Sequence, residues 1–318
     1  MNEFEFIKNL LKPLATSPLS LSLCDDIALL RNKNLAFSTD TICENTHFLK
    51  DTDPNKISAK LLRVNISDLC AKAIFPKYYS LNLSFNQDTI NKQWLESFVT
   101  GLKKTQSSFG ISLLGGDTTT TKHGSVFSAT IFGEIEQKYI SRKGAKDGDL
   151  IFVTGSLGDS FIGLNILKNQ LVTTAKNKNY FIKKYELPSP RIEIIKFLRS
   201  VASASIDISD GIIQDLNHIL SSSSCGANLM LDSIPTSSFA NKILNIHKIS
   251  KQQLITHGDD YEILFTSPKK HFNLIKSTAK SLPFSITNIG TITNKHTGIK
   301  TPDTPSIKIS SPGYTHHL

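Results

Sequence analysis

The chain has 318 residues, of which 39% are hydrophobic and 20% are charged, so we expect a globular protein, and its length favours two domains. Its longest apolar runs fall well short of the ~20 residues that cross a bilayer, and acids stand near the start, where a signal peptide carries bases. We therefore expect no membrane contact and a cytoplasmic location. The net charge of +9 raises nucleic-acid binding as an alternative, but the lysines are scattered and form no basic stripe.

The cysteines fit a reducing compartment. No two of them have the C-x-x-C spacing that is typical of a zinc cluster or a redox motif. We therefore expect free thiols at Cys24, Cys43, Cys70 and Cys225.

The first clear element is an amphipathic helix over residues 57–73, where apolar residues recur at helical spacing. Asn65 and Asp68 are three positions apart in this helix, so they share one side of it. The next elements in chain order are a strand at residues 81–85, a helix at 90–102 and a strand at 125–133.

A polar, glycine-containing stretch at residues 141–149 separates these elements from the second half of the chain. We place the domain boundary there, which gives domains at residues 1–140 and 141–318. The second half begins with a strand at residues 150–154 and a helix from Ser160. Further on, Asp210 is expected to be the N-cap of a helix that starts near Ile212.

Aspartates recur where an apolar, strand-like run ends or a helix begins. Any one of them fits an ordinary cap or turn residue, since Asp favours both positions. If they meet in space, however, their mutual repulsion must be offset by cations, and carboxylate oxygens suit Mg²⁺. The pattern predicts a metal site that draws on Asp25, Asp26, Asp40, Asp68, Asp117, Asp207 and Asp210.

The short motifs around these aspartates resemble those of the thiamine-monophosphate kinases. The similarity runs from about Asp25 to Tyr314, and the ordered set is specific although a single Gly-Gly-Asp is common. In chain order the motifs are Asp25-Asp26-Ile27-Ala28-Leu29-Leu30, Ser38-Thr39-Asp40-Thr41, His47-Phe48, Val64-Asn65-Ile66-Ser67-Asp68-Leu69, Leu114-Gly115-Gly116-Asp117-Thr118-Thr119, Asp207-Ile208-Ser209-Asp210-Gly211 and Gly258-Asp259-Asp260-Tyr261-Glu262.

The resemblance implies a two-domain α/β fold, that of the aminoimidazole-ribonucleotide synthetase superfamily. In this fold the N-terminal domain pairs with that of a second subunit to form a β-barrel, so a homodimer is expected. The implied activity is that of a thiamine-phosphate kinase, a phosphotransferase with a phosphate group as acceptor. It uses ATP and several Mg²⁺ ions to convert thiamine monophosphate to thiamine diphosphate.

The resemblance also implies roles for individual residues. The expected catalytic residues are Asp207, Asp210, Asp117 and Arg142. The expected ATP contacts are Gly116, Asp117, Arg142 and Ser209, and the expected contacts of thiamine monophosphate are His47, Asp259 and Tyr314. The expected metal ligands are Asp26, Ser38, Thr39, Asp40, Asp68, Asp117, Asp207 and Asp210.

The implied chemistry agrees with the spread of aspartates. In phosphoryl transfer a protein mainly positions the reactants and neutralises charge. ATP and a phosphate-monoester acceptor bring several negative charges together, which divalent cations offset by bridging carboxylate and phosphate oxygens. The motifs offer no activated nucleophile with an adjacent base, so we expect direct in-line transfer.

Five residues depart from the pattern of the family. Cys24 stands where relatives have Gly before the paired aspartates, and Lys72-Ala73 replaces a Met-Gly pair. His257 replaces the first Gly of a Gly-Gly-Glu-Asp-Tyr-Glu run, and Asp259 replaces its Glu. These departures concern loop geometry more than the class of reaction.

Three other functions stay open at this point. A sister enzyme, such as a selenophosphate synthetase or an aminoimidazole-ribonucleotide synthetase, shares the ATP-dependent phosphate chemistry, but the Gly-Asp-Asp-Tyr-Glu motif at residues 258–262 favours the thiamine enzyme. An inactive nucleotide-binding module is expected to lose metal-type aspartates, and all are present here. A nucleic-acid binder would show affinity that falls steeply with salt.

Overall fold

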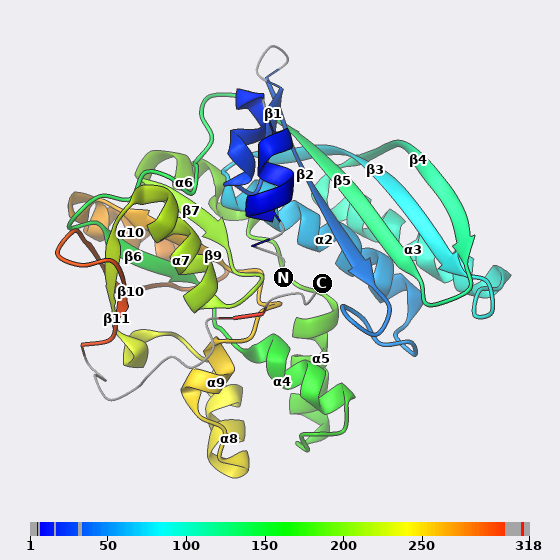
Figure 1. The fold of residues 1–318 in the computed structure, drawn as a ribbon. Coiled ribbons are helices and arrows are strands. Elements are labelled where there is room, and N and C mark those ends of the chain that lie inside the picture. The colour runs from blue at the N-terminus through cyan, green and yellow to red at the C-terminus, as the bar shows by residue number, and fades with distance from the viewer. Residues whose placement is uncertain (1–4, 6, 16, 31–33, 303–312, 315–318) are drawn as a thin grey trace.

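The computed structural model describes residues 5, 7–15, 17–30, 34–302 and 313–314. Two β-sheets with helices packed on them make up most of this part of the chain (Figure 1). This arrangement confirms the mixed α/β class predicted from the sequence.

The first sheet is formed by the N-terminal half. Its five strands, in spatial order, are β1 (Ala28–Leu30), β2 (Leu35–Cys43), β5 (Val126–Glu134), β3 (Phe75–Asn86) and β4 (Ser112–Thr121). β3 and β4 run parallel, and the other neighbours are antiparallel. The predicted strands at residues 81–85 and 125–133 are confirmed within β3 and β5.

Two long helices accompany this sheet. Helix α2 (Pro54–Ala71) begins after Asp53, whose carboxylate accepts a hydrogen bond from the N–H of Asn55, with Pro at the first helical position. Helix α3 (Lys92–Phe109) is capped by Asn91 and ends at Gly110, which has a left-handed φ of 64°. Both helices were predicted, and α3 extends about two turns beyond the predicted end at residue 102.

Helix α2 occupies the centre of the molecule. It packs against α3 and against β2 and β5 of the first sheet, and its C-terminal part also contacts β7 (Ala204–Asp207) of the second sheet. Because it is covered on several sides, even its polar residues Ser58, Lys60, Asn65 and Ser67 are buried. Buried polar groups require partners, and Asn65 and Ser67 find theirs on β2 of the first sheet and β7 of the second.

The second sheet is formed by the C-terminal half. Its strands, in spatial order, are β11 (Gly298–Lys300), β8 (Gly226–Leu229), β10 (Ile286–Thr293), β6 (Leu150–Thr154), β9 (Ile263–Ser267) and β7 (Ala204–Asp207). The accompanying helices are α4 (Asp159–Leu167), α5 (Ala175–Glu186), α6 (Ile195–Val201), α7 (Ile212–Ser223), α8 (Ser238–His247), α9 (Lys251–Ile255) and α10 (Phe272–Thr278). The shorter turns of helix are Ile7–Leu11, Lys12–Leu14, Pro18–Leu23, Ile192–Ile194, Leu231–Ser233, Lys269–His271 and Ala279–Ser281. Among the described residues, no helix is long and apolar enough to span a membrane.

The two sheets share one hydrophobic core. Residues of the N-terminal half, such as Ile66 and Leu69, belong to the same buried cluster as Phe152, Ile195 and Phe265 of the C-terminal half. The strands of the first sheet end at Glu134 and those of the second begin at Leu150. The division into domains at residue 140 stays a prediction.

The edge strand β4 is exposed along its length, from Ser112 to Thr120. Its pairing with β3 shifts by one residue at Leu114, so Gly115 lies opposite Ser80. At Gly116, whose φ is 151°, a β-carbon would meet the carbonyl oxygen of Leu81 at 1.7 Å, so only glycine fits there. The first sheet therefore presents an uncovered edge that includes two exposed leucines, Leu113 and Leu114.

Candidate active site

A cleft with a volume of about 1410 Å³ lies where the two halves of the chain meet. Its walls come from residues 24–28, from β2 and α2, from the loop after β7, and from the segments around α4 and α9. Pockets for one small ligand usually measure ~300–1,000 Å³, so this cleft has room for two.

The structure brings most of the predicted site residues to this cleft. The predicted residues that line it are Asp26, Ser38, Thr39, Asp40, His47, Asp68, Arg142, Asp207, Ser209, Asp210, Asp259 and Tyr314. Gly116 and Asp117 lie on β4 instead, away from the lining residues.

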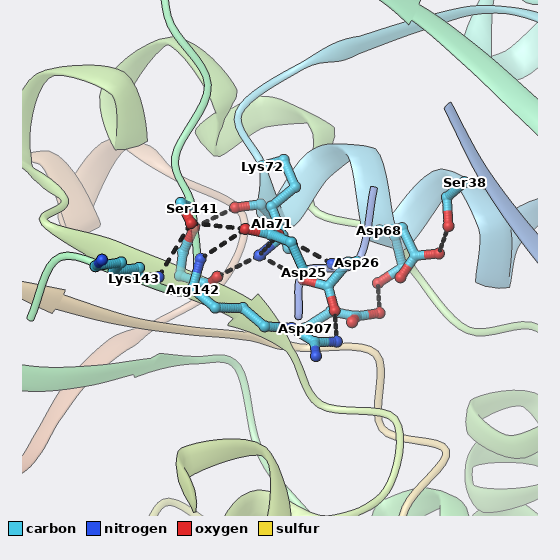
Figure 2. Close-up of polar contacts among 12 residues, drawn as sticks. Asp25, Asp26, Ser38, Asp68, Ala71, Lys72, Ser141, Arg142, Lys143 and Asp207 are labelled. Carbon is cyan, nitrogen blue, oxygen red and sulfur yellow. Dashed lines mark hydrogen bonds and ion pairs between the residues drawn. The ribbon is translucent and has the colours of Figure 1, made fainter. Parts of the chain in front are cut away.

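Three carboxylates from three segments meet in this cleft. Oxygens of Asp26, Asp68 and Asp207 lie within 4.8 Å of one another, although the residues are far apart in the sequence (Figure 2). Asp26 belongs to the loop before β1, Asp68 to α2 and Asp207 to the end of β7. Three of the seven aspartates in the predicted site therefore converge, whereas Asp117 lies on β4.

Hydrogen bonds from α2 and β2 fix the acidic cluster. The hydroxyl of Ser38 on β2 donates to Asp68, and that of Ser67 donates to Asp207 over 2.7 Å. The amide oxygen of Asn65 accepts the backbone N–H of Asp40 at 2.9 Å. Asn65 and Asp68 share one side of α2, as their spacing predicted, and this side faces β2.

Crowding and burial perturb these carboxyl groups. Burial, with the charges of Asp26 and Asp210, raises the pKa of Asp40 to about 6. Burial, together with Asp26 and Asp40, raises the pKa of Asp207 to about 7, and the pKa of Asp68 also lies well above its usual value because of burial and the charges of Asp40 and Asp207. In the absence of a cation, the cluster therefore resists full ionisation.

Asp26 differs from the others because it lies between two cations. Arg142 forms an ion pair with one of its oxygens and Lys72 with the other (Figure 2). Burial by itself would raise the pKa of Asp26, but the charges of Arg142 and Lys72 lower it to about 2. This carboxylate stays ionised throughout the physiological range.

The donor set of the cluster fits Mg²⁺. Its oxygens come from carboxylates and from the hydroxyl of Ser38, which are the hard ligands that this ion prefers. Burial and, to a lesser extent, neighbouring carboxylates raise the pKa values of Asp40, Asp68 and Asp207, and a divalent cation would offset both effects by favouring the ionised form.

Thr39 does not point its side chain toward this cluster. Side chains alternate along a strand, so Thr39 lies on the face of β2 opposite to Ser38 and Asp40. Its hydroxyl is 2.8 Å from that of Thr130 on β5. A metal contact of Thr39 would therefore come from its backbone carbonyl.

The prediction that Asp210 caps α7 is wrong. The N-cap is Gly211, with a φ of 114°, no side chain caps the helix, and Asp215 lies in its first turn. Asp215 accepts hydrogen bonds of 3.2 Å from the N–H groups of both Asp210 and Gly211. The carboxylate of Asp210 therefore lines the cleft, and its oxygens lie within 4.8 Å of ligand atoms of Asp215 and His218.

The predicted substrate residues lie in the same cleft. Asp259 adopts a left-handed φ of 67°, and its carboxylate contacts the ammonium of Lys60 at 3.3 Å. Lys60 is buried, lies 3.8 Å from the ring centre of Tyr185 and donates to the carbonyl of His47 at 2.9 Å. His47 accepts the N–H of Cys43 through Nδ1 at 3.1 Å.

Ser209 and Tyr314 are held next to the predicted substrate residues by backbone hydrogen bonds. The carbonyl of Ser209 accepts the N–H of Asp259 at 2.8 Å. The N–H of Tyr314 donates to the carbonyl of Asp210 at 3.0 Å, and its own carbonyl accepts from Gln214 at 2.6 Å. Tyr314 is exposed and lines the cleft.

Comparison with known proteins identifies the family. Residues 24–135 match the family described as AIR synthase related protein, N-terminal domain. The chain is 38% identical over 302 residues to the thiamine-monophosphate kinase of Buchnera aphidicola subsp. Acyrthosiphon pisum (strain APS), covering 92% of this chain and 91% of that relative. The chain belongs to the thiamine-monophosphate kinase family.

Other members of the kinase family agree along the whole length. The chain is 37% identical over 325 residues to the thiamine-monophosphate kinase of Escherichia coli (strain K12), which covers 99% of this chain and 98% of that relative. A solved structure described as AaThiL complexed with AMPPCP and TMP superimposes with a TM-score of 0.88 and 28% identity, covering 99% of this chain and 97% of that one. The aminoimidazole-ribonucleotide synthetase-like fold is thereby confirmed, whereas the barrel across a dimer stays a prediction.

The structure shows the backbone conformation or the contacts of three residues that depart from the kinase family pattern. Cys24 is exposed and has a φ of −115°, which any residue adopts, so its position does not require Gly. Ala73 has a φ of 59°, the left-handed conformation that suits the Gly of relatives. His257 contacts the ring of Phe161, with the ring centres 3.9 Å apart.

Sequence reasoning missed four charged or polar residues near the kinase motifs, namely Lys60, Lys72, Asp215 and His218. A lysine on an apolar helix face was the available signal, because Lys60 lies three residues after Ile57 and lysine is rarely buried unless it is paired. Lys72 was noted only as a departure from the family pattern, and its partners come from distant segments. Asp215 and His218 lie close to Asp210 in sequence, but they stand outside the motifs.

Proposed function

We propose that this chain transfers the γ-phosphoryl group of ATP to thiamine monophosphate, which yields ADP and thiamine diphosphate. The observation that carries this proposal is the meeting of Asp26, Asp68 and Asp207 in a cleft large enough for two ligands. The names of the relatives and the pair of ligands named for the AaThiL structure support it.

The charges of the cleft suit this reaction. Two phosphate-bearing ligands would add negative charge to a cluster whose carboxyl groups already repel one another. Bound Mg²⁺ would neutralise these charges and bridge carboxylate and phosphate oxygens. We propose that the metal ligands are Asp26, Ser38, Asp40, Asp68, Asp207 and Asp210, with Thr39 contributing through its backbone.

The cleft also offers groups for both ligands. Arg142 has a planar guanidinium suited to phosphate oxygens and, with Ser209, is proposed to contact ATP. Asp259 carries a negative charge suited to cationic thiamine, and the exposed ring of Tyr314 lines the cleft and is suited to stacking on a heterocycle. His47 is proposed to hydrogen-bond the acceptor phosphate.

We further propose that the active form is a homodimer. The uncovered edge strand β4, with Leu113 and Leu114 exposed, is suited to contact with a second copy. A dimer would also account for Gly116 and Asp117, which motif matching assigns to the site but which lie on that edge in this chain. In this arrangement each chain completes the site of its partner.

Mixing two inactive variants tests the shared site. In a heterodimer of Asp117→Asn and Asp207→Asn chains, one site would carry both substitutions and the other would be intact. Random exchange of subunits is then expected to restore up to about a quarter of the wild-type activity. If the mixture is shown to exchange subunits and the activity is still not restored, Asp117 lies outside the site.

The activity itself is tested by incubating the purified protein with ATP, Mg²⁺ and thiamine monophosphate and measuring thiamine diphosphate. Free thiamine is the matched control, because it lacks the phosphate that the charged groups require. We expect its phosphorylation to be slower by at least about a hundredfold, since unpaired buried polar groups discriminate strongly. Equal rates on both acceptors, or binding of ATP without turnover, would favour a sister enzyme or an inactive nucleotide-binding module.

The remaining predictions concern the surroundings of the protein. A cytoplasmic location and the lack of a nucleic-acid partner stay predictions from composition. A gel-shift titration over a range of salt concentrations checks the second one.

A further inference from the structure

Lys72 lies directly behind the acidic cluster. It follows the last residue of α2, one turn after Asp68, and its side chain is 0% exposed. It does not line the cleft, whereas Asp25 and Asp26 do. This is also the position at which the chain replaces the Met-Gly pair of its family with Lys72-Ala73.

The ammonium group of Lys72 has a partner for each of its three donors. Nζ lies 3.0 Å from Oδ1 of Asp25, forms an ion pair with Oδ2 of Asp26, and donates to the carbonyl of Ser205 at 2.6 Å (Figure 2). Ser205 stands two residues before Asp207 on β7. One buried charge thus connects α2, the loop of Asp25 and Asp26, and the strand that carries Asp207.

The loop of Asp25 and Asp26 consequently has positive charges of the protein itself beside it. Asp25 accepts the hydroxyl of Ser141 at 2.6 Å and the N–H of Arg142 at 3.2 Å, and Asp26 pairs with Arg142 as well as with Lys72. Asp40, Asp68 and Asp207 form no ion pair in the described part of the chain. The ion pairs of Lys72 therefore lie on the side of the cluster formed by Asp25 and Asp26.

We propose that Lys72 is a built-in counter-cation, which holds the Asp25–Asp26 loop in place and reduces by one the number of divalent ions that the site binds. A methionine at this position would leave both aspartates without this charge, and a further divalent ion would have to supply it. Lys72 is a positioning residue in this scheme, because it acts through Asp25 and Asp26 and does not reach the cleft. The inference rests on the metal site of the proposed function.

The test counts bound Mn²⁺ per chain by electron paramagnetic resonance and measures the thermal unfolding midpoint in EDTA and in Mn²⁺. Wild type is compared with Lys72→Met and Lys72→Arg. We expect Lys72→Met to bind one more Mn²⁺ per chain than wild type, to unfold at a lower temperature in EDTA, and to recover in Mn²⁺. Lys72→Arg keeps the charge and is expected to match the wild-type count.

Lys60→Met is the matched control, because Lys60 is equally buried in α2 but pairs with Asp259. It is expected to lower the unfolding midpoint without changing the Mn²⁺ count. An unchanged count in Lys72→Met, with no added dependence on Mn²⁺, would overturn the inference. Failure of wild type to bind any Mn²⁺ would instead overturn the proposed metal site.

The inference can also be tested if Lys72→Met fails to fold. Lys72→Met protein that is soluble only with Mn²⁺ or Mg²⁺ supports the inference, since the ion then replaces the lost charge. If it is insoluble in both conditions, the double variant Lys72→Met/Asp25→Asn removes one charge of each sign and is expected to fold with the wild-type count. Failure of the double variant as well would show that packing, and not charge, requires the lysine.

Discussion

The hydroxyl of Ser67 donates a hydrogen bond of 2.7 Å to Oδ2 of Asp207. The two residues belong to α2 and β7, so this bond joins the helix of the first half to the sheet of the second half within the acidic cluster. It orients a carboxylate that is almost fully buried, at 3% exposure.

Replacement of Ser67 by Ala is expected to weaken metal binding through Asp207. Loss of a hydrogen bond to a ligand typically costs about 10- to 100-fold in metal affinity. The Mg²⁺ concentration for half-maximal activity should rise by about that factor, with the activity largely recovered at saturating Mg²⁺. An unchanged Mg²⁺ requirement would show that Asp207 does not need this orientation.

Asp207→Asn or Asp210→Asn is expected to lower kcat by at least about a hundredfold, because charge stabilisation at such sites supplies several kcal/mol to the transition state. Circular dichroism should show an intact fold. Asp88→Asn, at an exposed turn after β3, is the control and should retain full activity. Activity near the wild-type level in both site variants would contradict their role as metal ligands.

The metal-free protein is expected to lose stability as the pH rises from about 4 to about 7. The pKa of Asp40 is raised to about 6 and that of Asp207 to about 7, by burial and by neighbouring carboxylates. Both exceed the unfolded value of about 3.9, so the folded state binds more protons in this window and is destabilised as they dissociate. Burial lowers the pKa of His218 to about 4, which acts in the opposite direction up to about pH 6.5 but concerns a single group.

The unfolding midpoint in EDTA should therefore be lower at pH 7.5 than at pH 5.5, by at least about 3 °C. Saturating Mg²⁺ should shrink or reverse this difference, because the ion favours the ionised carboxylates. Asp207→Asn should reduce the slope in EDTA. A midpoint in EDTA that rises with pH would contradict the repulsion within the cluster.

Cys24→Gly is expected to keep or raise the activity. The side chain is exposed, its φ of −115° is open to any residue, and no predicted ligand is removed. Greater freedom of the unfolded chain should lower the stability by no more than about 1 kcal/mol. Complete loss of the metal-dependent activity would make the thiol a functional group.

Transfer is expected to be direct, with both substrates bound together in the cleft. Initial-rate plots should intersect, and the configuration at the transferred phosphorus should invert. The carboxylates that line the cleft are proposed metal ligands, which makes them poor nucleophiles. Parallel lines, or label retained on the protein from γ-labelled ATP without acceptor, would show a covalent intermediate instead.

The sequence predicted the helices and strands that carry the site better than the contacts between their side chains. Strands β3, β5 and β6 and helices α2 and α3 carry strong periodicity and end signals, and all were predicted. The convergence of Asp26, Asp68 and Asp207 also followed from a pattern, because each stands at the end of an element. Local chemistry was sufficient for these features.

The failures have a common physical cause, which is dependence on residues outside the local motif. Asp210 stands just before the helix, but Gly211 is the N-cap, and Asp215 accepts the N–H groups of Asp210 and Gly211. The burial of Lys72 depends on Asp25, 47 positions earlier, and on Ser205, 133 positions later, as its ion pair and hydrogen bond show. The position of Asp117 depends on β4 being an edge strand, which the order of strands alone determines.

Helix α2 carries Lys60, which contacts Asp259 of the proposed acceptor region, and Asp68 of the acidic cluster. These residues are eight positions apart, which corresponds to about 12 Å along a helix and a little over two turns. The length of α2 thus fixes the distance between the acceptor region and the metal cluster. Inserting one residue between them would rotate one end by about 100° against the other, so changes in the length of α2 should be far more damaging than substitutions along it.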